Sequence, residues 1–147
     1  MIKATRHVGF VVKNLERSLA FYEKYLQFKI WKRAVETGKY IDNVVGIKDV
    51  TVEWIKLKTA DGFLVELLQY HSHPSDQGAE KCIPSNRICS AHVAFTVQDV
   101  EIMHKRLTEN GYYCNSVPQL SPDGNVKVMY CHDPDGIILE FVEEINK

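Results

Sequence analysis

Two histidines and two glutamates that occur in matching sequence contexts are the residues best suited to chemistry in this chain. His7 opens the stretch HVGFVV, and His92 opens HVAFTV. Glu66 and Glu140 each stand four residues after the glycine of an Asp-Gly pair, in DGFLVELL and DGIILEFV. A charged side chain inside such an apolar run is costly unless something pairs with it. Two imidazoles and two carboxylates suit a borderline divalent cation, so these four residues predict a metal site.

An open metal site of this kind predicts proton transfer beside a carbonyl. Four protein ligands leave positions for water or substrate if the coordination is octahedral. The metal can then act as a Lewis acid that stabilises the enolate formed when the adjacent carbon loses a proton. A coordinated or nearby carboxylate can be the base. Glu36 and Glu53 are further candidates for a second base, although a solvent-facing role fits them better.

The remaining histidines fit structural or surface roles better than metal binding. His71 and His73 could bind a metal, but they lie in a polar segment beside Pro74. His104 falls on a predicted helix and is expected to be solvated, while His132 precedes an Asp-Pro-Asp-Gly turn and is expected to be a turn residue.

The elements that position the four residues repeat along the chain. Each histidine begins a predicted strand, and each strand leads into an amphipathic stretch with a capping residue before it, Asn14 in one case and Asp99 in the other. The apolar stripes of these helices are Leu15, Leu19, Tyr22 and Leu26 in the first, and Val100, Met103 and Leu107, ending at Gly111, in the second. Further strands then lead to each Asp-Gly turn and its closing strand. The pattern predicts a duplicated βαβββ unit in an α+β fold.

Side-chain alternation along the strands allows all four residues to point away from the helices. His7 shares its face with Gly9, and His92 shares its face with Ala94 and Thr96, while the bulky residues lie on the opposite face. Glu66 and Glu140 likewise alternate with apolar neighbours that would pack on the helices. The small residues beside the histidines would leave room for a ligand.

Length and composition bound the remaining possibilities. The 147 residues fit a single domain, 1–147, which we divide into a first module (5–70), a connector (71–90) and a second module (91–144). A net charge of −1 without a basic stretch predicts no nucleic-acid partner, and the apolar runs are too short to predict a membrane span. We expect a cytoplasmic protein whose four cysteines are reduced and unpaired: Cys82, Cys89, Cys114 and Cys131.

Four stretches carry a resemblance to a known family: HVGFVVKNLERSLAFYEKYLQF, LVELLQY, HVAFTVQDVEIMHKRL and HDPDGIILEFVEE. Over about residues 5–144 the chain resembles the vicinal oxygen chelate superfamily, the glyoxalase and bleomycin-resistance fold. The resemblance implies paired βαβββ modules that form a cupped, mostly antiparallel sheet around a metal, with helices on the outside. Mapped by motif, it implies the metal ligands His7, Glu66, His92 and Glu140.

Within that superfamily, the ligand pattern is most similar to glyoxalase I, a lactoylglutathione lyase that isomerises the hemithioacetal of methylglyoxal. The resemblance implies a divalent-metal-dependent lyase or isomerase in which Glu140 or Glu66 moves a proton. The implied cofactor is one divalent ion per site, Ni²⁺, Zn²⁺, Co²⁺, Mn²⁺ or Fe²⁺. The sequence departs from the family at Gln27, which replaces the glycine usual after YL, and it lacks a match for the arginines that hold glutathione carboxylates.

Other members of the fold remain alternatives. A methylmalonyl-CoA epimerase-like isomerase shares the enolate chemistry, but it typically has Gln where Glu66 stands. An iron dioxygenase or a thiol transferase uses two histidines and one glutamate. A non-catalytic drug-binding protein of this fold typically lacks the metal ligands. The resemblance also implies a small-molecule substrate and a homodimer, and the segments 36–50 and 71–90 are expected to set substrate identity.

Overall fold

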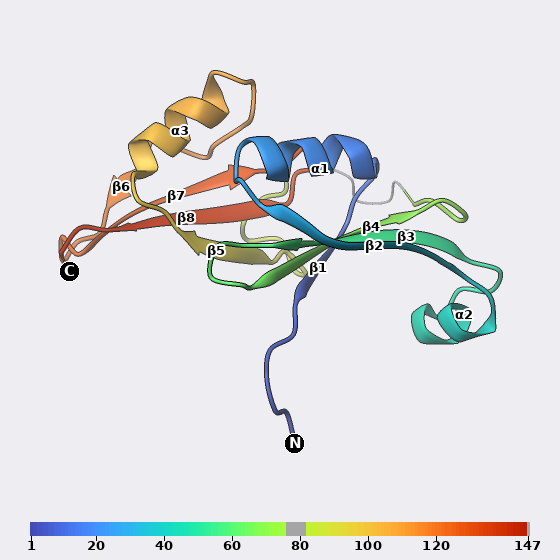
Figure 1. The fold of residues 1–147 in the computed structure, drawn as a ribbon. Coiled ribbons are helices and arrows are strands. Elements are labelled where there is room, and N and C mark those ends of the chain that lie inside the picture. Colours follow the sequence, from blue (N-terminus) through green and yellow to red (C-terminus); the bar gives the residue numbers. More distant parts are fainter. Residues whose placement is uncertain (76–81, 147) are drawn as a thin grey trace. The chain divides into compact units, whose positions relative to one another are not determined.

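The computed structural model describes residues 1–75 and 82–146. The chain forms two compact units, residues 1–78 and residues 79–147 (Figure 1). Part of the predicted connector 71–90 therefore lies outside the described residues. Among those that are described, no helix is long and apolar enough to cross a membrane.

The first unit is a four-stranded mixed sheet with two helices. Its elements are β1 (Val8–Val11), α1 (Leu15–Lys24), β2 (Lys29–Thr37), α2 (Lys39–Val45), β3 (Thr51–Lys58) and β4 (Leu64–Tyr70). The strand order is β1-β4-β3-β2; the β1–β4 pair is parallel and the other pairs are antiparallel. Helix α1 packs against β4, and Figure 1 shows α2 at the turn between β2 and β3.

The second unit repeats this arrangement without the extra helix. Its elements are β5 (His92–Thr96), α3 (Val100–Thr108), β6 (Gln119–Leu120), β7 (Val126–His132) and β8 (Ile138–Glu144). The strand order is β5-β8-β7-β6, again with one parallel pair, β5–β8. The predicted α+β fold of two βαβββ modules is confirmed.

Helix α2 is the element that the sequence analysis missed. It lies in the segment 36–50, for which the sequence predicted a role in substrate identity but no helix. Gly46 ends the helix in the left-handed conformation (φ 72°), which glycine adopts without a steric penalty. The Asp42 carboxylate then accepts hydrogen bonds from the backbone N–H groups of Asp49 and Val50, at 2.9 and 3.0 Å, and fixes the chain that enters β3.

The two long helices begin where the caps predicted. The Asn14 side chain accepts from the Arg17 N–H, and the Asp99 side chain accepts from the Ile102 N–H, both at 2.8 Å. Each helix is also tied to the last strand of its own sheet. The first helical N–H group donates to Gln69 Oε1 in the first unit (2.7 Å) and to Glu143 Oε2 in the second (2.9 Å).

The burial pattern confirms the predicted alternation of faces. In the two closing strands the residues on either side of the glutamate are fully buried: Val65, Leu67, Leu139 and Phe141. Phe10 in β1 and Val12 directly after it are likewise buried, while Val11 is 63% exposed. These residues form the apolar core on the face away from the predicted ligands. In the first unit a second apolar cluster of Ile41, Val50 and Val52 also packs on the ligand face of the sheet.

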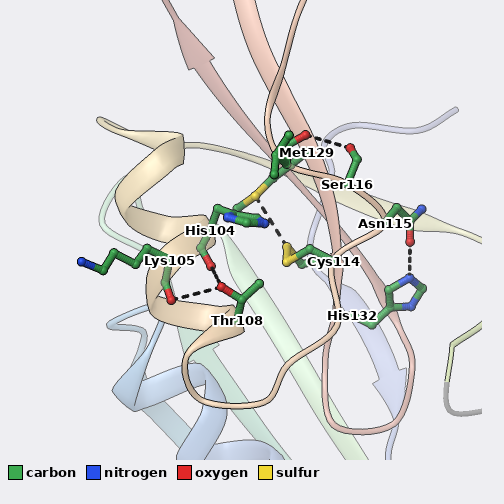
Figure 2. The surroundings of a disulfide bond; sticks show 10 residues. His104, Lys105, Thr108, Cys114, Asn115, Ser116, Met129 and His132 are labelled. Atoms are coloured by element: carbon green, nitrogen blue, oxygen red, sulfur yellow. Dashed lines mark hydrogen bonds between the residues drawn. A yellow bond between two sulfur atoms is a disulfide. The ribbon is translucent and has the colours of Figure 1, made fainter.

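The expectation of four unpaired thiols was wrong for two of the cysteines. Cys114 and Cys131 form a disulfide (Figure 2), while Cys82 and Cys89 are free. The pairing arises because an isolated antiparallel bridge sets Cys114 opposite Cys131, with the Cα atoms 4.0 Å apart. Their spacing of 17 residues matches no motif, so this contact was not predictable from the sequence. Cysteine usage therefore lends no support to the cytoplasmic prediction, which stays a prediction.

Candidate metal centre

The first unit brings two of the predicted ligands together. His7 directly precedes β1, and Glu66 lies in the middle of β4, opposite Gly9 in the parallel register. His7 stands two residues before Gly9, so its side chain is on the same face as Glu66. The two side chains meet with His7 Nε2 3.1 Å from Glu66 Oε2. We call this pair the first half-site.

The second unit forms the equivalent pair. Glu140 lies in β8 opposite Ala94, which follows His92 by two residues. His92 Nε2 is 3.0 Å from Glu140 Oε2. This pair, the second half-site, thus has the same strand register, the same atoms and nearly the same separation as the first. Its side chains are more exposed, 44% for His92 and 19% for Glu140, against 28% for His7 and 11% for Glu66.

The geometry of each half-site suits two neighbouring ligands of one metal ion. Metal–nitrogen and metal–oxygen bonds of about 2.1 Å at a right angle place the two ligand atoms about 3 Å apart. The observed separations are 3.1 and 3.0 Å. Nε2 is the ring nitrogen of His7 that faces the carboxylate. The other ring nitrogen, Nδ1, is buried and has no hydrogen-bond partner among the described residues. The residues present therefore fit a divalent ion.

The structure resolves the four predicted ligands into two pairs, one in each unit. Within residues 1–75 and 82–146, no group of three or more histidine, cysteine, aspartate or glutamate side chains is positioned to hold a metal ion. Each pair by itself supplies one nitrogen and one oxygen. That is fewer ligands than a protein-bound metal ion normally has.

Two residues beside the half-sites were not singled out from the sequence. Lys56 in β3 lies directly across from Glu66, and Tyr130 in β7 lies directly across from Glu140. They occupy equivalent positions in the two sheets. The signal that could have identified them is hairpin pairing, because each stands ten residues before its glutamate with the Asp-Gly turn between them. Side chains directly across an antiparallel pair lie on the same face.

Lys56 and Tyr130 give the two half-sites different chemistry. Lys56 Nζ is 3.3 Å from Glu66 Oε1. The Tyr130 hydroxyl lies 3.5 Å from His92 Nε2. Burial, together with the negative charge of Glu140, raises the pKa of the Tyr130 phenol, so this residue stays a neutral hydrogen-bonding group. One glutamate therefore has a cation beside it and the other a phenol.

The two carboxylates considered as a second base have different surroundings. Glu53 is not a solvent-facing residue, since its side chain is only 13% exposed and pairs with Arg33 (2.6 Å) and His71 Nε2 (2.8 Å). The hydrogen bond from His71, with help from Arg33, lowers the pKa of Glu53. Glu36 accepts a hydrogen bond from Trp54 Nε1 at 3.0 Å and shares the sheet face of the first half-site.

His132 differs from the expectation of a turn residue. It is the last residue of β7 and is 2% exposed. Its Nδ1 lies 3.0 Å from the Gly136 carbonyl, and its Nε2 lies 2.9 Å from Asn115 Oδ1 (Figure 2). Both ring nitrogens are thus occupied in holding the turn and the chain before β7. His132 is structural.

Comparison with protein families gives one match that spans most of the chain. Residues 5–141 match the family described as the glyoxalase/bleomycin resistance protein/dioxygenase superfamily. The match includes both half-sites, the first module and most of the second.

Solved structures with the same fold come from several bacteria. A glyoxalase family protein from Bacillus cereus is 25% identical, with a TM-score of 0.86, and the alignment covers 99% of this chain and 97% of that one. The fosfomycin resistance protein FosX from Listeria monocytogenes, solved with Mn(II) and sulfate, is 14% identical (TM-score 0.65, coverage 99% and 95%). A glyoxalase family protein from Enterococcus faecalis is 20% identical (TM-score 0.63, coverage 96% and 98%).

Proposed function

Because this chain belongs to the glyoxalase/bleomycin resistance protein/dioxygenase superfamily, we propose that it is a divalent-metal-dependent lyase or isomerase of the glyoxalase I type. The observation that carries the proposal is the pair of equivalent half-sites, in which an imidazole nitrogen and a carboxylate oxygen lie 3.1 and 3.0 Å apart. In this proposal residues 1–147 act as a single domain, and the residues of both half-sites are ligands of one kind of site that holds one ion.

His7, Glu66, His92 and Glu140 would hold the ion. Two carboxylates balance the charge of a divalent cation, and neutral imidazoles suit Ni²⁺, Zn²⁺, Co²⁺, Mn²⁺ and Fe²⁺ alike. FosX, which shares the fold, carries Mn(II). When bound, the ion supplies a Lewis acid that stabilises the oxyanion of an enolate.

The proton is moved by one of the two glutamates. A carboxylate that reaches the carbon next to the carbonyl takes its proton and returns it to the neighbouring carbon, which isomerises the substrate. The contacts favour Glu140 for this step. Glu66 Oε1 already faces the Lys56 ammonium, whereas Glu140 has no lysine or arginine partner among the described residues. The apolar core residues behind both glutamates keep the strands rigid while the proton moves.

The experiment that tests this function is turnover of the hemithioacetal of methylglyoxal and glutathione by protein loaded separately with each of the five metals. The proposal predicts thioester formation with at least one metal. It also predicts loss of turnover in Glu140→Gln and unchanged turnover in His73→Ala, a matched histidine variant in an exposed segment. Absence of turnover with every metal, in protein shown to bind them, would contradict the glyoxalase I assignment.

We also propose that two copies of the chain form a homodimer, as the family resemblance implies. The supporting observation is apolar surface on β2, an edge strand of its sheet, where Ile30 is 48%, Trp31 55% and Val35 57% exposed. Exposed apolar residues grouped on one strand are typical of an association surface. Light scattering should give twice the chain mass for the wild type and a smaller mass for Trp31→Glu.

A further inference from the structure

Lys56 is held rigidly beside the first half-site. Its side chain is only 17% exposed, and its Nζ lies 3.3 Å from Glu66 Oε1. The same ammonium sits over the Trp54 ring, 4.7 Å from the centroid. Trp54 is 8% exposed and is fixed in turn by its hydrogen bond to Glu36. A lysine confined by a ring and a carboxylate loses little further freedom when it binds a ligand.

The second half-site shows that Lys56 is not needed to keep a glutamate in the closing strand. Glu140 occupies the equivalent position, and its neighbours there are His92 and the Tyr130 phenol. The described residues place no lysine or arginine beside Glu140. Neutralising a carboxylate in an apolar strand therefore does not explain why Lys56 lies beside Glu66, and Lys56 is available for another role.

The net charge of the site indicates an anionic ligand. With neutral histidines, Glu66, Glu140 and a divalent ion sum to zero. On the same sheet face, Lys32 and Glu36 have opposite charges that offset each other, and Lys58 is exposed to solvent at the end of its strand. Lys56 then leaves one positive charge beside the metal. The Glu66 carboxylate lies between Lys56 and His7, but it is already counted in this sum, so the site keeps a net positive charge that attracts an anionic ligand.

We propose that Lys56 binds the anionic group of the substrate, and that the substrate is a small carbonyl compound carrying a carboxylate. This inference rests on the proposed function, because it requires that Glu66 helps to hold a metal. Lys56 then donates a charge-assisted hydrogen bond to the carboxylate while the carbonyl oxygen faces the metal. Lys56 is thereby the residue that selects charged over neutral carbonyl compounds.

The test compares two probes of similar shape, pyruvate and butane-2,3-dione, which differ in whether a carboxylate or a methyl ketone flanks the carbonyl. Calorimetry measures the binding of each to metal-loaded protein. We expect Lys56→Gln to weaken pyruvate binding by about 10- to 100-fold, the value of one hydrogen bond to a charged group. Binding of butane-2,3-dione should not change. Lys56→Arg should retain pyruvate binding to within a few-fold, because it keeps the charge.

The metal itself provides a readout that a merely structural lysine would not give. Removing a cation 3.3 Å from a ligand carboxylate should make Lys56→Gln bind the metal more tightly than the wild type. A structural role would instead weaken metal, pyruvate and butane-2,3-dione together. Lys58→Gln is the matched control, since Lys58 is an exposed residue two positions along the same strand and should behave as wild type.

The outcomes separate this inference from the proposed function. Wild-type protein that takes up no metal would overturn the proposed function and the role of Lys56 with it. Wild-type protein that binds metal, with equal pyruvate affinity in the wild type and Lys56→Gln, would overturn the role of Lys56 alone. Metal-loaded wild type that does not bind pyruvate would overturn the assignment of a carboxylate substrate.

Discussion

The two units of this protein share a scaffold down to single hydrogen bonds, yet they differ beside the predicted metal ligands. In both, a histidine next to the first strand meets a glutamate in the last, at 3.1 and 3.0 Å. The residue across from the glutamate is Lys56 in one unit and Tyr130 in the other. The two units thus share the histidine–glutamate pair that would hold an ion in the proposed function, and they differ in the residue across from each glutamate. Four predictions test which parts of the scaffold are equivalent.

The largest effect is expected in the core behind the glutamates. Leu67 and Phe141 hold equivalent positions, opposite Phe10 and Phe95, and both are fully buried. We expect Phe141→Ala to lower the free energy of unfolding by about 3–5 kcal/mol and Leu67→Ala by about 2–5 kcal/mol. Urea unfolding measures both. If one substitution costs less than 1 kcal/mol, the two sheets are not equivalently packed.

The next effect concerns the tie between each helix and the last strand of its sheet. Gln69 and Glu143 each accept the first N–H group of a helix. Replacing either with alanine removes that acceptor, so we expect the free energy of unfolding to fall by about 1–3 kcal/mol. Glu143→Ala should have the larger effect, because a carboxylate also interacts favourably with the helix dipole. Glu143→Gln should recover most of the loss. Unfolding curves that are the same for the wild type and Glu143→Ala would show that this hydrogen bond does not contribute to stability.

A smaller effect is expected where the chain leaves each helix. Gln27 and Gly111 both stand three residues after a helix ends, with φ of 61° and 82°. A side chain costs about 1 kcal/mol in this left-handed region. Gly111→Ala should therefore destabilise by roughly that amount, while Gln27→Gly should be neutral or slightly stabilising. A stability gain from Gly111→Ala would contradict this account of the two positions.

The smallest effect is a pH-dependent one at Glu53, in the first unit. The pKa of Glu53 is lowered by the hydrogen bond from His71 and by Arg33. A carboxylate with a lowered folded-state pKa contributes stability above its ordinary value of 4.5, and this contribution is lost as the pH falls through the lowered pKa. Glu53→Gln should thus be less stable than wild type at neutral pH, and the difference should disappear in acid. A difference that persists at pH 2 would rule out the ionic origin.

The sequence predicted those parts of the fold that depend on local patterns. The caps Asn14 and Asp99, the alternation of faces and the recurrence of the βαβββ unit are all periodic or positional signals, and the structure confirms them. Gln27 stands where the family usually has glycine. Its φ of 61° lies in the left-handed region, and this explains the family's preference for glycine at that position. Helix caps and side-chain periodicity can be predicted from the sequence because each depends on residues only a few positions apart.

Contacts that depend on which strands are neighbours could not be predicted from the sequence. Lys56 and Tyr130 flank the half-sites only through hairpin register, and Cys114 meets Cys131 only through an isolated bridge. Helix α2 was missed because it is seven residues long and depends on glycines at both ends rather than on an apolar stripe. These contacts follow from tertiary structure, and composition or spacing carries little information about them.

The central claim is that the two half-sites hold one ion together. The most direct measurement is the metal content of the wild type, Glu66→Ala and Glu140→Ala by elemental analysis after exposure to nickel, zinc, cobalt, manganese or iron, with His73→Ala as the control. The account predicts about one ion per chain in the wild type and in His73→Ala after dialysis, and much less in either glutamate variant, because each loses one of the four ligands and one of the two carboxylates that balance the charge of the ion. No ion in the wild type, or a full complement in one glutamate variant, would contradict it.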